Sequence, residues 1–124
     1  MAWVAVAFGG ALGSVLRHGV NRLTASRWTS FPVGTVVVNL SGCFVIGLLA
    51  GLIATKRLSL PFYAREFVFV GILGGFTTFS TFSLETVWLA QQGYAGRAAA
   101  YVALSLALSL AAMAAGLLVG RGVA

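Results

Sequence analysis

Uncharged hydroxyl and amide side chains are the residues of this sequence best suited to chemistry. The segment Gly71–Glu85 places two adjacent glycines before a series of threonines, serines and phenylalanines. Asn39 lies within another apolar run, and Tyr101, Ser105 and Ser109 recur every four positions, which places them on one helix face. Donors without a fixed charge suit a small anion that must bind strongly enough to shed its water and still leave quickly.

The same sequence offers little to an enzyme. Its 124 residues include one histidine, one cysteine and two acidic residues. No pair of nucleophile and base, no metal cluster and no phosphate-binding loop can be assembled from this set, so we expect no enzymatic activity. His18 has no second metal-binding residue nearby and is expected to lie at the membrane interface. Cys43 has no partner for a disulfide and is expected to pack as a small residue.

The composition predicts an integral membrane protein. The chain is 60% hydrophobic and 8% charged, and its mean hydropathy is +1.00. A soluble domain of this length needs fewer hydrophobic residues to build its core. The apolar runs, each close to the ~20 residues that cross a bilayer, predict four transmembrane helices at about residues 2–23, 32–55, 62–91 and 96–120. We therefore expect an all-α membrane protein with a single four-helix domain over residues 1–124.

The basic residues are balanced between the two sides of the predicted bundle. They occur singly at the ends of spans rather than in a patch with aromatic residues, so a nucleic-acid partner is not expected. One side collects Lys56, Arg57, Arg65 and Arg121, and the other collects Arg17, Arg22, Arg27 and Arg97. Because an excess of Lys and Arg normally sets orientation, this tie predicts insertion in both orientations and an antiparallel homodimer.

Small residues predict close contacts between helices. Gly9 and Gly13 in the first span, and Gly47 and Gly51 in the second, have the four-residue spacing that lets membrane helices approach each other closely. Four such helices enclose little polar volume by themselves. Two copies of the chain are therefore expected to build a pore.

The third span is expected to be broken near its centre. Gly74 and Gly75 are followed by four hydroxyl residues in the next six positions, which is a poor sequence for an uninterrupted helix. Free carbonyls at such breaks commonly coordinate cations such as Na⁺. After the break, Phe79 and Phe82 share a helix face, and Glu85 continues the same line. The positive ring edges could contact a small anion, and plain apolar packing is the alternative.

Three polar features each allow two interpretations. Arg17 either extends to the lipid headgroups or lies in a water-filled vestibule. Asn39 either joins two helices by hydrogen bonds or presents its amide donor to a permeation path. Serines are common where membrane helices pack closely, so the hydroxyl row of the fourth span is weak evidence for a solute path when taken alone.

Together these segments resemble the Fluc (CrcB) family of fluoride channels over essentially the whole chain. The runs that match the motifs of its first three helices are Gly9–Arg17, Gly34–Gly42 and Gly71–Phe82. The most specific part is the run Gly-Gly-Phe-Thr-Thr-Phe-Ser-Thr-Phe that begins at Gly74. The glycine spacings alone would not be specific.

The resemblance implies a function and a set of site residues. It implies a dual-topology antiparallel homodimer in the bacterial inner or plasma membrane, with two pores that let fluoride leave the cytoplasm passively and protect the cell. The residues that it places in the fluoride pore are Asn39, Phe79, Phe82, Tyr101, Ser105 and Ser109, with Thr81 and Glu85 at further pore positions, and Arg17 in the vestibule. It also implies a structural Na⁺ at the dimer centre, held by the backbone carbonyls of Gly74 and Thr77 from both copies. Fluoride and membrane lipid are the other expected partners.

Two functions of other classes are the alternatives. A small proton-coupled multidrug transporter also uses four helices and dual topology, but it needs a membrane-embedded acid in its first span. The first span of this chain contains no acid. A non-transporting scaffold protein is the second alternative, and it would have no use for hydroxyls on three separate spans or for a break at Gly74 and Gly75.

Overall fold

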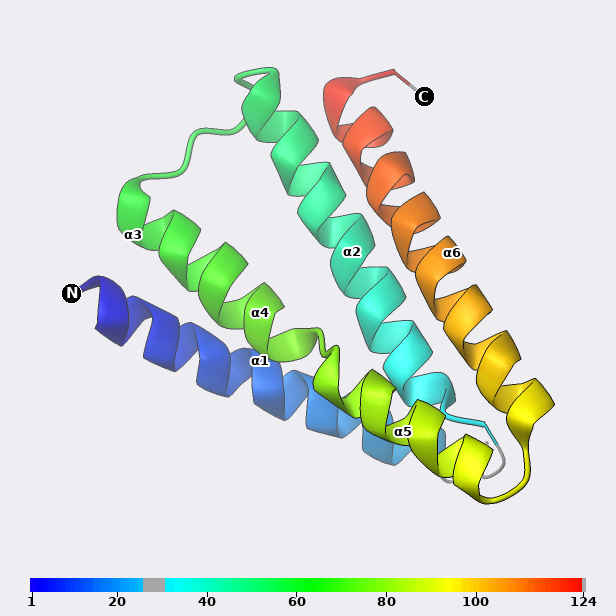
Figure 1. Ribbon diagram of the computed structural model, residues 1–124. Helices are drawn as coiled ribbons and strands as arrows, with labels where there is room; N and C mark the ends of the chain where they lie inside the picture. Colours follow the sequence, from blue (N-terminus) through cyan, green and yellow to red (C-terminus); the bar gives the residue numbers. More distant parts are fainter. Residues whose placement is uncertain (26–30, 124) are drawn as a thin grey trace.

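Helices account for most of the chain. The computed structural model describes residues 1–25 and 31–123, and no β-strand occurs within them. The three uninterrupted long helices are α1 (Ala2–Ala25), α2 (Val33–Ala54) and α6 (Ala95–Arg121). A third span runs in several pieces over Phe62–Gln91 (Figure 1). All four spans are long and apolar enough to cross a membrane, so the predicted all-α fold with four membrane helices is confirmed. Of the basic residues in the charge tie, Arg27 lies outside the described residues.

The third span is interrupted after its first half. Its pieces are α3 (Phe62–Arg65), the π-helical segment η1 (Glu66–Leu73), α4 (Gly74–Phe76) and α5 (Ser80–Gln91). The two glycines lie inside α4, and the backbone leaves the helix just after them at Thr77, which is extended (φ −82°, ψ 156°). The predicted break is therefore present, but residues 77–79 form it and the glycine pair does not.

Glycines bring α2 and α6 into backbone contact. A Cβ atom at Gly47 would collide with the backbone of Met113 in α6, and a Cβ atom at Gly116 would collide with the backbone of Phe44 in α2. Gly51 and Gly120 are in the same situation one turn further along. The two helices consequently run side by side over most of their length (Figure 1). The close approach predicted for the glycines of α2 is confirmed.

The first span uses its glycines in the same way. Gly9 lies against the backbone of Phe67 and the Cα atom of Gly71, and Gly13 lies against the backbone of Ile72. Helix α1 therefore packs along η1 and α4, the first half of the third span (Figure 1). Both glycine pairs that the sequence singles out make their contacts within one chain.

One small cluster of buried apolar side chains lies where α5 meets α6. It consists of Phe82, Leu89, Ala98 and Tyr101. Many large apolar side chains elsewhere are exposed, among them Trp3, Phe8 and Leu110. Exposed apolar surface of this extent marks a membrane protein or an interaction surface. The pair α1 with η1 and the pair α2 with α6 come together near α5 and diverge toward α3 (Figure 1).

Candidate functional site

One side chain of α2 holds the break in the third span. Asn39 donates from Nδ2 to the carbonyl of Thr78 (2.9 Å) and accepts at Oδ1 from the N–H of Thr78 (2.7 Å). The carboxamide thus takes the place of a helical peptide group and satisfies both backbone groups of Thr78. Of the two interpretations of Asn39, hydrogen bonding between helices is the one present in this structure, while its part in permeation stays a prediction.

The same arrangement frees two backbone carbonyls. In a continuous helix the N–H of Thr78 would donate to Gly74, and the N–H of Thr81 would donate to Thr77. The first N–H donates to Asn39 instead, and the second donates to the side chain of Thr78 (3.2 Å). The carbonyls of Gly74 and Thr77, which the family resemblance assigns to Na⁺, are therefore among those at the break that lack their helical donors.

The oxygens of these two carbonyls are suitable ligands for a sodium ion. Na⁺ is coordinated by unwound backbone carbonyls in other membrane proteins. The guanidinium of Arg17 donates to the carbonyl of Thr77 (Nη1 to O, 3.1 Å), but a carbonyl oxygen has two lone pairs and can accept this bond and also face an ion. Two oxygens do not complete a coordination shell, so such a site needs further oxygen ligands. The contact of Arg17 with the break is one that the sequence did not predict.

A cavity of about 470 Å³ lies beside the break and is called the inner cavity here. Its lining includes the expected pore residues Asn39, Phe79, Phe82, Ser105 and Ser109, together with Cys43. These residues come from α2, the break, α5 and α6, so four separate segments bring them together. Five of the eight expected pore residues line this one cavity.

The polar and aromatic groups of the inner cavity differ in burial. The side chain of Ser105 is 6% exposed, and its hydroxyl has no hydrogen-bond partner among the described residues. An unpaired buried hydroxyl costs about 1–3 kcal/mol, so this group favours a ligand or water in the cavity. Phe82 is 7% exposed and contacts the ring of Phe79 (centroids 5.5 Å apart), whereas Phe79 is 74% exposed. The two rings touch, but Phe79 lies in the break just before α5, and only Phe82 is covered by this chain.

A carboxylate lies between two hydroxyls where α2, α5 and α6 meet. Tyr101 donates to Oε2 of Glu85 (2.6 Å), and Thr35 donates to Oε1 of the same side chain (3.0 Å). The ring of Tyr101 also packs on Phe82 (centroids 5.2 Å apart). The sequence predicts Glu85 and Tyr101 at the pore but does not join them to Thr35. Thr35 lies four residues before Asn39, on the same face of α2, and this spacing is the signal that could have placed Thr35 among the site residues.

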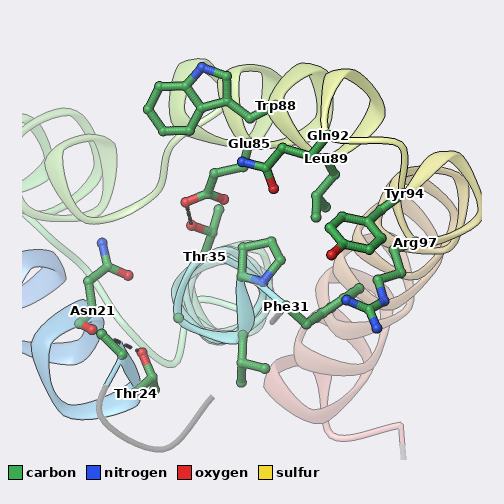
Figure 2. A pocket seen from close by; sticks show the side chains of 14 residues that line it. Asn21, Thr24, Phe31, Thr35, Glu85, Trp88, Leu89, Gln92, Tyr94 and Arg97 are labelled. Carbon is green, nitrogen blue, oxygen red and sulfur yellow. Dashed lines mark hydrogen bonds between the residues drawn. The ribbon is translucent and has the colours of Figure 1, made fainter. Parts of the chain in front are cut away.

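A second cavity, of about 580 Å³, lies at the end of the molecule where α1 ends and α2 begins, and is called the outer cavity (Figure 2). Thr35 and Glu85 line it, together with residues of α1, α5 and α6. Tyr101 binds Glu85 and packs on Phe82, which lines the inner cavity. The cluster of Thr35, Glu85 and Tyr101 therefore separates the outer cavity from the inner cavity.

Other expected residues have different surroundings. Thr81 is half-buried and lines neither of these cavities. His18 is exposed, and residues 1–25 and 31–123 contain no group of three or more His, Cys, Asp or Glu that could bind a metal. Cys43 is a free, half-buried thiol on the wall of the inner cavity.

The sequence is similar to those of known proteins over nearly its whole length. Residues 4–117 match the family described as "CrcB-like protein, Camphor Resistance (CrcB)". A relative from Paracoccus denitrificans is 50% identical over 117 residues, which cover 94% of this chain and 92% of the relative. A relative from Nitrobacter winogradskyi is 48% identical over 126 residues, which cover 98% of both chains. A relative from Rhizobium johnstonii is 48% identical over 122 residues, which cover 98% of this chain and 97% of the relative.

All three relatives are named fluoride-specific ion channel FluC. Channels of this kind are not enzymes, so the family confirms the expectation that this protein has no enzymatic activity. The four span-length helices and the bacterial relatives make it a multi-pass bacterial membrane protein. The resemblance of the sequence motifs is confirmed as well, and the chain belongs to the CrcB (Fluc) family.

Proposed function

We propose that this protein is a fluoride-selective ion channel that works as an antiparallel homodimer with two pores. The observation that carries this proposal is the inner cavity, where the buried Ser105 hydroxyl, beside Asn39 and the ring of Phe82, has no hydrogen-bond partner within residues 1–25 and 31–123. Such a site offers donors to an anion without holding it by a full positive charge. The printed name of the relatives, fluoride-specific ion channel, supports the choice of fluoride.

The proposed path runs from one cavity to the other. In the inner cavity the hydroxyls of Ser105 and Ser109 replace part of the water around fluoride, and the edges of Phe79 and Phe82 contact it. The hydroxyls of Tyr101 and Thr35 extend the line of donors, but both are bonded to Glu85 in this structure. Fluoride can use these two donors only when the carboxylate releases them, so movement of Glu85 controls this end of the path.

The proposed flux is passive, and the electrochemical gradient of fluoride alone drives it outward. Fluoride enters a cell as the neutral weak acid HF, which dissociates in a more neutral cytoplasm and leaves the anion trapped. A channel then lets the anion leave down its electrochemical gradient, which protects the cell. A narrow, dehydrated path of hydroxyls and ring edges would admit fluoride and reject the larger chloride ion.

A second copy of the chain completes the proposed pore. Phe79 is exposed although it lines the inner cavity, and Gly74 is exposed at the same opening. An antiparallel partner would cover this side and would add its own Gly74 and Thr77 carbonyls to those of the first copy. A sodium ion held by the four carbonyls would offset their negative ends and join the two copies at the centre.

The direct test of this function is fluoride efflux from liposomes that contain the purified protein. One set of liposomes is loaded with fluoride and another with chloride, and release is followed with ion-selective electrodes. We expect rapid release of fluoride and retention of chloride, with no dependence on an imposed proton gradient. Retention of both ions by folded protein would refute the proposal, and flux that requires a proton gradient would favour the transporter alternative.

Replacing Phe82 with isoleucine is expected to reduce fluoride flux by up to about tenfold. An aromatic contact contributes about 0.5–1.5 kcal/mol beyond its buried area, and isoleucine stays apolar but is smaller and lacks the ring edge. The initial rate of efflux in the liposome assay measures the effect, and the same change at Phe79 tests the second ring. Phe62→Ile, at an exposed ring on α3, is the control and should leave the rate unchanged. An unaltered rate in the Phe82 variant would remove the ring edges from the mechanism.

A further inference from the structure

The outer cavity contains a positive charge that the proposed function does not use. Arg97, in the first turn of α6, lines this cavity with Thr35 and Glu85. Its guanidinium lies over the ring of Tyr94, 4.6 Å from the ring centroid. Cation–π contacts of this kind hold a guanidinium in place without neutralising it.

Arg97 has no carboxylate partner among the described residues. The chain has two acidic residues, Glu85 and Glu66. Both oxygens of Glu85 accept hydrogen bonds from hydroxyls, and Glu66 lies at the start of η1, on the far side of the break. The positive charge of Arg97 is therefore available to a mobile anion in the cavity.

Apart from Arg97 and Glu85, the cavity wall is uncharged and contains both polar and apolar side chains. The amides of Asn21 and Gln92 and the hydroxyl of Thr24 line it. Figure 2 shows Asn21 and Thr24 on α1, Glu85 on α5 with Gln92 just after the end of that helix, and Arg97 beside Tyr94 on the other side of the start of α2. An anion in this cavity is therefore surrounded by a wall that carries neutral polar groups, one cation and the carboxylate of Glu85.

We propose that the outer cavity is a mouth of the permeation path and that Arg97 raises the local concentration of fluoride there. This inference rests on the proposed function and adds a residue that determines conduction. The carboxylate of Glu85 alone would repel an approaching anion, and the guanidinium offsets that repulsion. A single charge on the wall of a water-filled cavity changes the local concentration of a monovalent anion by about two- to threefold at low ionic strength.

Ionic strength separates this role from a structural one. The Debye length is about 30 Å at 0.01 M salt and about 3 Å at 1 M, so mobile ions screen a wall charge at the higher concentration. A packing defect would reduce flux equally under both conditions. An arginine that only anchors the protein to lipid phosphates would show its effect with anionic lipids and lose it in liposomes of neutral lipid.

The test compares fluoride efflux of Arg97→Gln and wild-type protein in neutral-lipid liposomes at about 0.01 M and about 1 M of an impermeant salt. We expect flux about two- to threefold below wild type at low salt, equal flux at high salt, and near-normal flux for Arg97→Lys at both. Arg65→Gln, at an exposed arginine of α3 outside both cavities, is the matched control.

Two results would overturn the inference while leaving the proposed function intact. The first is that the Arg97→Gln variant releases fluoride as fast as wild type at low salt. The second is that this variant loses the same fraction of flux at both salt concentrations. A wild-type protein that releases no fluoride would instead refute the proposed function, and this inference would fall with it. The elution profile of each purified variant on size-exclusion chromatography shows that the comparison is made between folded proteins.

Discussion

Replacing Asn39 with alanine is expected to lower fluoride flux by roughly thirtyfold or more. The carboxamide satisfies the N–H of Thr78 at 2.7 Å and its carbonyl at 2.9 Å. Each backbone group left without a partner costs about 1–3 kcal/mol, so the native break loses at least about 2 kcal/mol against other conformations. Since about 1.4 kcal/mol corresponds to a factor of ten, that lower figure corresponds to roughly thirtyfold.

The effect extends beyond Asn39 because the break positions several groups at once. Phe79 directly follows Thr78, and the carbonyls of Gly74 and Thr77 lack helical donors only because the helix is interrupted there. If the segment closed into a continuous helix, Thr77, Thr78 and Phe79 would shift relative to the inner cavity that they line. The same change would return both carbonyls to helical hydrogen bonds.

Two variants in the same helix make the Asn39 experiment specific. Ser41→Ala removes a hydroxyl that bonds the carbonyl of Val37 in its own helix (2.6 Å), so its flux should remain near wild type. Asn39→Asp keeps an acceptor for the N–H of Thr78 but loses the donor, so its flux should fall between the other two. Wild-type flux in the alanine variant, with unchanged elution and thermal unfolding, would show that the break does not depend on this side chain.

The fold could largely be predicted from the sequence because its signals are local. An apolar run of about 20 residues and a glycine pair spaced by four are properties of single segments. Such spacing shows that one face of a helix lacks side chains and can pack closely, but it does not show which helix packs there. Gly47 and Gly51 were therefore predicted as contact residues, whereas Gly116 and Gly120, which complete the contact, were not.

The candidate site could be predicted only in part, since its hydrogen bonds join distant segments. The glycine pair at Gly74 indicates the neighbourhood of the break, but Asn39, 39 positions before Thr78, determines which residues leave the helix. Glu85 binds Thr35 across 50 positions. No pattern within one helix contains these pairings, which depend on how α2 packs against the third span.

Gly116→Ala is expected to destabilise the protein, whereas Gly96→Ala in the same helix is not. A Cβ atom at Gly116 would meet the backbone of Phe44 and, at 2.8 Å, the N atom of Leu48, neither of which can move independently of α2. Overpacking of this kind costs about 1–3 kcal/mol, more than the gain of up to about 1 kcal/mol from replacing a helical glycine with alanine. At Gly96 no atom lies within 4 Å of such a Cβ, so only the gain remains.

Thermal unfolding of the purified variants measures this difference. We expect a midpoint lower on the order of 5 °C for Gly116→Ala and unchanged or slightly higher for Gly96→Ala. Fluoride flux should fall as well in the first variant, because α6 carries Ser105 and Ser109 and α2 carries Asn39 on the wall of the same cavity. Pushing the two helices apart separates those groups. Equal stability of the two variants would mean that α2 and α6 are not in backbone contact, and the inner cavity would then lack the geometry on which the proposed path depends.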